Sequence, residues 1–147
     1  MRANTSVKNP LSWSSPSFTL APYNLLFLPG GHEKSVRQVI DSQRLHSLLA
    51  DYVPATAKPS NKAIGAICHG VMVLSEAMTG EGGKSLLADK TTTALPNVFE
   101  GAAFWAARAF LGDYYKTYGA NSGNVEVAIK KRLNSPDQFK SSISPGP

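Results

Sequence analysis

The sequence predicts an α/β domain built around a parallel sheet, because short apolar runs alternate with longer stretches of helical periodicity. Residues 24–28 and 63–67 are the clearest runs, and each is bounded by polar or turn-forming residues, as buried strands are. Residues 91–95 are rich in threonine, which favours strands, and are expected to form a third one. The resulting order, β-α-β-α-β-α-α, is typical of three layers with helices on both faces of a parallel sheet.

Length and composition fit one globular domain. The 147 residues are 42% hydrophobic and 17% charged, which is enough apolar material for a single core. Residues 1–22 are rich in serine and interrupted by three prolines, so we expect loose order there. The α/β domain is then expected over residues 23–140, followed by a flexible tail over residues 141–147.

Charge and cysteine content exclude several classes of protein. The single cysteine rules out an internal disulfide framework and a cysteine-based zinc site. The net charge is +5, but no stripe of basic and aromatic residues indicates nucleic-acid binding. No apolar stretch is long enough to cross a membrane, and no signal-peptide core is present. We therefore expect a cytoplasmic protein with neither nucleic acid nor membrane as partner.

Four helices are predicted from apolar residues that recur at intervals of three and four. They are expected over residues 34–52, directly after the 63–67 strand, over residues 98–110 and, more weakly, over residues 123–133. Gly112 is expected to end the third helix, because glycine readily adopts the conformation that follows a helix. His46, in the middle of the first helix, is expected at the surface or at an interface.

Cys68 and His69 fall between the second strand and the helix that begins with Gly70-Val71-Met72. A sharp strand-to-helix elbow raises a nucleophile above the sheet, where backbone N–H groups and the helix dipole stabilise a thiolate. A neighbouring histidine can transfer protons near neutral pH. The alternative is that Cys68 only packs in the core, as most single cysteines do.

A glycine turn ends the first strand, at Gly30-Gly31-His32. Ligands of parallel sheets bind outside the carboxyl ends of the strands. Because Cys68 and His69 end the neighbouring strand, we expect the two segments to converge on one crevice. Gly31 is also expected to need a positive φ.

With these residues, the chain resembles the ThiJ/PfpI superfamily, which has the class I glutamine amidotransferase-like fold. The resemblance rests on Leu26-Phe27-Leu28-Pro29-Gly30-Gly31-His32, on Ala66-Ile67-Cys68-His69-Gly70, and on the stretch from Gly83 to Glu100. It covers about residues 20–140 and implies a three-layer, flavodoxin-like sandwich. The branch that the chain resembles most includes glutathione-independent glyoxalases of the glyoxalase III type and stress-induced, chaperone-like proteins.

The resemblance implies a Cys-His-Glu triad without a metal or another cofactor. Cys68 would be the nucleophile, His69 the general acid and base, and Glu100 the residue that orients the imidazole. The oxyanion hole would consist of the backbone N–H groups of Gly31 and His69.

Two residues of this implied site, His32 and Glu100, have alternatives that the sequence leaves open. Gly30 and His32 would contact substrate, although His32 could equally only flank the next helix. Glu100 also fits a helix capping box, in which its carboxylate would bind the backbone N–H of Asn97.

The chain departs from the family at both ends. Family members begin with a strand and a glutamate that binds the nucleophilic sulfur, and they continue into a further strand and helix. Neither is visible here, so we expect an incomplete sheet with its outer strands missing and with exposed apolar surface. A homodimer would be a natural consequence.

The resemblance implies a cofactor-independent enzyme that converts methylglyoxal, a small reactive aldehyde, to lactate. In this reaction Cys68 would form a hemithioacetal, and His69 would move a proton between adjacent carbons. Glutamine amidotransfer fits less well, because its later paired histidine and glutamate are not found. The alternatives are a truncated, non-catalytic paralogue acting as a redox-sensing or chaperone-like stress protein, and a decayed reading frame with no function.

Overall fold

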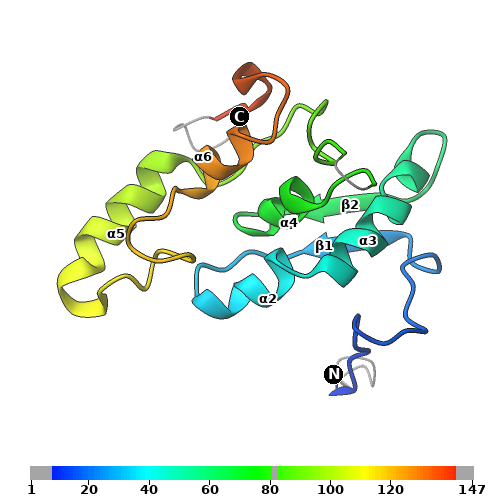
Figure 1. The fold of residues 1–147 in the computed structure, drawn as a ribbon, viewed down its shortest axis with the longest axis horizontal. Coiled ribbons are helices and arrows are strands. Elements are labelled where there is room, and N and C mark those ends of the chain that lie inside the picture. The colour runs from blue at the N-terminus through cyan, green and yellow to red at the C-terminus, as the bar shows by residue number, and fades with distance from the viewer. Residues whose placement is uncertain (1–7, 81–82, 142–147) are drawn as a thin grey trace, which may run out of the picture.

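The structure is a computed structural model that describes residues 8–80 and 83–141. It has two strands, five α-helices and three short 3-10 helices within these ranges (Figure 1). The elements are β1 (Leu25–Leu28), η1 (Lys34–Val36), α2 (Arg37–Ile40), α3 (Gln43–Tyr52), η2 (Pro54–Thr56), β2 (Ala63–Ala66), α4 (Gly70–Glu76), α5 (Asn97–Leu111), α6 (Val125–Lys130) and η3 (Pro136–Gln138). The predicted α/β class with a parallel sheet is confirmed, and the sheet is two strands wide.

The two strands pair in parallel, with Leu25 opposite Ala63 and Leu28 opposite Ala66. The third strand predicted over residues 91–95 is wrong, because the backbone of Thr92 bonds elsewhere. Its N–H donates to Gln138 O at 3.0 Å, and its carbonyl accepts from Lys140 N at 2.8 Å. This segment therefore pairs with the chain that follows η3.

The helix predicted over residues 34–52 is interrupted in the structure. Ser42 has an extended backbone, and its hydroxyl accepts from Leu45 N at 3.2 Å, so it starts α3 as a new N-cap. The prediction for His46 was also wrong, because its ring is buried and its Nε2 lies 2.7 Å from Ile40 O.

The later helices lie close to their predicted positions. The third predicted helix corresponds to α5, which ends at Gly112 with a φ of 58°, and the fourth corresponds to α6. The helix expected after the second strand is α4, which ends at Glu76.

The helices leave one face of the sheet uncovered. The core includes Leu28, Leu49 and Val73, and α4 packs against α2, α3, α6 and β1. On the opposite face of β1, Leu25 is 65% exposed and Phe27 is 58% exposed. Parallel sheets are normally covered on both faces, so this bare apolar face agrees with an incomplete sheet.

The N-terminal segment was expected to be loosely ordered over residues 1–22, of which residues 1–7 lie outside the described part. Within residues 8–22, Leu20 is 5% exposed, and Trp13 and Phe18 pack against the core. The expected tail likewise lies outside the described part, except for Ser141. Within residues 8–80 and 83–141, no helix has the length and apolar character that crossing a bilayer requires.

Candidate active site

Cys68 lies at a sharp turn between β2 and α4. Its φ is +54°, a conformation that costs a residue with a Cβ on the order of 1–2 kcal/mol. The turn is fixed by two backbone hydrogen bonds, from Ile67 N to Leu28 O at 3.2 Å and from Gly70 N to Ile67 O at 2.8 Å. The surrounding backbone thus holds the cysteine in the strained conformation that nucleophile elbows have.

Two glycines let the elbow lie directly against the end of β1. A Cβ on Gly30 would lie 2.5 Å from Cys68 Cβ, and a Cβ on Gly70 would lie 2.2 Å from Leu28 O. Both distances are shorter than any Cβ can tolerate, so only glycine allows this approach. The structure therefore brings the glycine turn and the elbow together at one edge of the sheet.

The sulfur of Cys68 lies 3.3 Å from Nδ1 of His69, within hydrogen-bond distance. Cys68 is partly exposed, whereas His69 is 1% exposed. Burial and, to a smaller degree, the nearby His32 lower the pKa of the His69 imidazole to about 4. The ring is therefore neutral at pH 7, and with its proton on Nε2 it can accept the thiol proton at Nδ1.

Two backbone N–H groups, one at the glycine turn and one at the elbow, are available to a ligand. Among the described residues, neither Gly31 N nor His69 N donates to a protein acceptor. Gly31 has a φ of +145°, and a Cβ built on it would meet no atom within 4 Å. These groups belong to the residues expected to form the oxyanion hole.

Glu100 is buried in α5, and its Oε2 accepts from the backbone N–H of Val125 at 2.8 Å. No hydrogen bond or ion pair joins it to His69 in the described part of the chain, so its role in a triad stays a prediction. Burial raises the pKa of the Glu100 carboxyl, opposed in part by the Val125 N–H and by the charge of Lys116.

The capping-box alternative for Glu100 was wrong. The N-cap of α5 is Pro96, one residue earlier than that motif requires, and Glu100 therefore lies beyond the capping position. The N–H of Asn97 instead donates to Glu126 Oε2 at 2.8 Å.

His32 is held by the connection between α5 and α6, residues 112–124. Its ring stacks on Tyr115 at 4.4 Å and meets the edge of Tyr114 at 5.1 Å. The buried hydroxyl of Thr117 donates to His32 O at 3.2 Å. Sequence reasoning missed these three partners, because they lie more than 80 residues from His32 and no local pattern links them to it.

A cavity of about 360 Å³ opens beside the sulfur. It is mostly apolar and is lined by Ala66, Ile67, Cys68, Val71, Thr93, Ala94 and Leu95. Part of its wall thus comes from the segment that sequence reasoning assigned to a third strand. Cys68 lines this cavity, and with the neutral His69 imidazole within hydrogen-bond distance of its sulfur the thiol can add to a carbonyl group.

Comparison with known proteins matches the chain to one family model and to one curated relative. A family model described as "ThiJ/PfpI family-like" matches residues 1–142. An uncharacterized protein of Schizosaccharomyces pombe is 34% identical over 70 residues, which are 47% of this chain. The match covers 26% of that relative, so the chain spans about a quarter of its length. No solved structure matches the chain.

Proposed function

The chain belongs to the ThiJ/PfpI-like family, and from that membership we propose that it is a cofactor-independent, glyoxalase III-like enzyme that converts methylglyoxal to lactate. The observation that carries the proposal is the 3.3 Å approach of Cys68 Sγ to His69 Nδ1 at a strained elbow. The reaction needs a nucleophile, a base that is neutral before the reaction and donors for an alkoxide. Cys68, His69 and the backbone N–H groups of Gly31 and His69 would supply them.

In the first step, the thiol proton of Cys68 passes to Nδ1 of His69 while the sulfur adds to the aldehyde carbon. A C–S bond forms, and the carbonyl electron pair moves onto oxygen. The N–H groups of Gly31 and His69 would stabilise this alkoxide, because neither donates within the described protein. Proton return from His69 completes the hemithioacetal.

In the second step, His69 removes the proton from the carbon that carries sulfur and delivers it to the neighbouring ketone carbon. The hydroxyl proton of the hemithioacetal moves to the ketone oxygen, so the sulfur-bearing carbon becomes a carbonyl carbon. The product is a lactoyl thioester on Cys68, and attack by water releases lactate and restores the thiol. The sum is methylglyoxal plus water giving lactate, so no external oxidant or reductant is needed. Gly30 and His32 would line the substrate side of this site.

Glu100 remains in the proposal as the residue that orients His69. Its Oε2 is occupied by Val125 N–H, but its Oε1 has no hydrogen bond among the described residues. With Nδ1 of His69 facing the sulfur, a carboxylate oxygen would have to receive the proton of Nε2. This is the contact through which Glu100 would act.

The wider setting is part of the same proposal. We propose a cytoplasmic protein whose partner is a small reactive aldehyde, with no role for nucleic acid or membrane. A homodimer is also proposed, supported by the apolar side chains that Leu25 and Phe27 expose on the bare sheet face.

The proposal is tested by incubating the protein with methylglyoxal in the absence of glutathione and following lactate by proton NMR. We expect lactate from the wild type, none from Cys68→Ala, and the wild-type rate from Ser47→Ala, a control at an exposed position remote from the elbow. Lactate formation by Cys68→Ala at the wild-type rate would reject the proposal.

A redox-sensing or chaperone-like role is the second candidate, favoured by the partly exposed thiol and the bare sheet face. Hydrogen peroxide would convert the Cys68 thiolate to a sulfenic acid and itself be reduced to water. Mass spectrometry after mild peroxide would then show oxidised Cys68 in a folded protein that leaves methylglyoxal unconsumed.

A further inference from the structure

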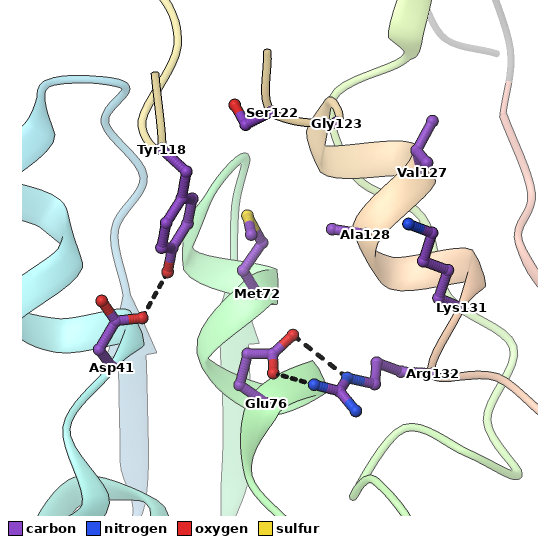
Figure 2. A pocket seen from close by; sticks show the side chains of 10 residues that line it. All are labelled: Asp41, Met72, Glu76, Tyr118, Ser122, Gly123, Val127, Ala128, Lys131 and Arg132. Carbon is purple, nitrogen blue, oxygen red and sulfur yellow. Dashed lines mark hydrogen bonds and ion pairs between the residues drawn. The ribbon is translucent and has the colours of Figure 1, made fainter. Parts of the chain in front are cut away.

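A second cleft, of about 520 Å³, lies across α4 from the Cys68 cavity. Val71 of α4 lines the Cys68 cavity, whereas Met72 and Glu76, one helical turn apart, line this second cleft. Figure 2 shows its walls: Tyr118 and Asp41 stand on one side, and the side chains of α6 and the two residues that follow Lys130 stand on the other. We call it the α4–α6 cleft.

The two carboxylates of the α4–α6 cleft are already neutralised within the chain. Asp41 accepts from the Tyr118 hydroxyl at 2.5 Å and from Arg37 Nε at 3.2 Å. Glu76 accepts from Arg132 through two bonds, from Nε at 3.3 Å and from Nη2 at 2.5 Å (Figure 2). Neither acid is therefore left to attract a cation.

The charge that remains in the cleft is positive. Lys131 lines it, is exposed and has no acidic partner or hydrogen-bond acceptor among the described residues. Its neighbour Arg132 uses Nε and Nη2 on Glu76, which leaves Nη1 without a hydrogen bond in the described chain. The ammonium of Lys131 suits a carboxylate or a phosphate group.

Most of the uncharged residues that line the cleft are apolar or aromatic. Met72 is 6% exposed and forms the floor, and Val127 contributes to one wall. The ring of Tyr118 is held by Asp41, and the Arg37 guanidinium lies 4.9 Å from the ring centroid. A flat apolar body can pack against this ring and floor at little cost in side-chain entropy.

We propose that the α4–α6 cleft binds a small organic anion, with a carboxylate or phosphate head at Lys131 and an apolar body against Tyr118 and Met72. The volume is in the range of small-molecule sites. The site uses no residue of the Cys68 cavity, so it stands whether or not the proposed enzymatic activity is found.

Binding is tested by titrating the full chain with phenylacetate and with phenyl phosphate at fixed ionic strength, followed by two-dimensional NMR. Inorganic phosphate tests the anionic head group by itself, and benzyl alcohol tests the apolar aromatic body by itself. We expect saturable shifts at residues of the cleft for at least one aromatic anion, and weaker binding, by about ten-fold or more, of either fragment. Which aromatic anion binds more tightly identifies the head group.

Lys131→Gln should weaken the binding of the aromatic anion by about five-fold, because the head loses its ammonium partner. Lys140→Gln, which removes an equal charge outside the cleft, should leave binding unchanged. Equal weakening by Lys131→Gln and Lys140→Gln would overturn the proposal. So would shifts that map outside the cleft, or no saturable binding below about 10 mM.

Discussion

The elbow at Cys68 and the surroundings of Glu100 each bury a titratable group, but the chain builds them in different ways. At the elbow, His69 is positioned by backbone contacts, chiefly the approach of Gly30 and Gly70 to the opposite strand end. Around Glu100, positions are set by side-chain hydrogen bonds between α5 and the start of α6. The elbow requires glycine at positions 30 and 70, because a side chain would not fit there. The surroundings of Glu100 require side chains that form specific hydrogen bonds.

This difference determines how each region should respond to substitution. A backbone contact of 2.2 Å leaves no room for adjustment, because a carbonyl in a strand cannot rotate away as a side chain can. A side-chain hydrogen bond can be replaced by another acceptor of similar shape. A small substitution at the elbow should therefore remove most of the free energy of unfolding, whereas substitutions around Glu100 should reduce it only in part.

The largest effect is expected from Gly70→Ala. Its Cβ would meet Leu28 O at 2.2 Å, so the elbow would have to move away from β1 at a cost of more than about 3 kcal/mol. Urea denaturation should show most of the stability lost. The matched control is Gly101→Ala in α5, where a Cβ meets nothing within 4 Å and should stabilise the helix by about 1 kcal/mol. Equal stability of Gly70→Ala and Gly101→Ala would contradict the view that the elbow depends on close backbone contacts.

A smaller loss is expected from Glu100→Ala. It leaves the N–H of Val125, a residue that is 1% exposed, without its acceptor, at a cost of about 1–3 kcal/mol. Glu100→Gln keeps an oxygen at the same place and should recover most of this loss in the same urea measurement. If glutamine were as destabilising as alanine, the charge of Glu100 would matter more than its hydrogen bond.

An effect of similar size to that of Glu100→Ala concerns pH. The folded-state pKa of His69, about 4, lies below the unfolded value near 6.5, so the unfolded chain binds the proton first as the pH falls. The free energy of unfolding should therefore decrease by about 1–3 kcal/mol between pH 6.5 and pH 4 because of His69. His69→Asn should remove this part of the pH dependence.

Glu100 acts in the opposite direction, because its pKa is raised by burial. The folded protein binds that proton first, so stability from Glu100 is lost as the pH rises through its folded-state pKa. The urea series should therefore be repeated in a Glu100→Gln background, where the slope due to His69 should appear steeper. An unchanged slope in His69→Asn would show that the imidazole is not held neutral by burial.

The same difference explains what the sequence could predict. The strands, the elbow and α5 follow from apolar periodicity and glycine positions, which are local patterns in residues 24–31, 63–70 and 97–112. The fate of residues 91–95 was not predictable, because Thr92 pairs with backbone more than 40 residues away. Neither the Val125 N–H that binds Glu100 nor the Thr117 hydroxyl that binds His32 has a local signature.

The break in the first predicted helix is an intermediate case. Ser42 is a good N-cap, which is a local signal, but the apolar positions on both sides continued the helical pattern across it. In the structure, Ser42 has an extended backbone and its hydroxyl caps α3, so the segment forms two helices. The sequence shows that Ser42 can cap a helix. It does not show whether this capping preference outweighs the apolar pattern that continues across Ser42.

The central claim is that Cys68 and His69 act as one nucleophile-base unit on methylglyoxal. The most direct measurement compares His69→Asn with the wild type, recording both alkylation of Cys68 by iodoacetamide and lactate formation from methylglyoxal. We predict that the variant remains folded, that its sulfur is still alkylated, and that it forms no detectable lactate. Lactate formation by His69→Asn at the wild-type rate would contradict the claim.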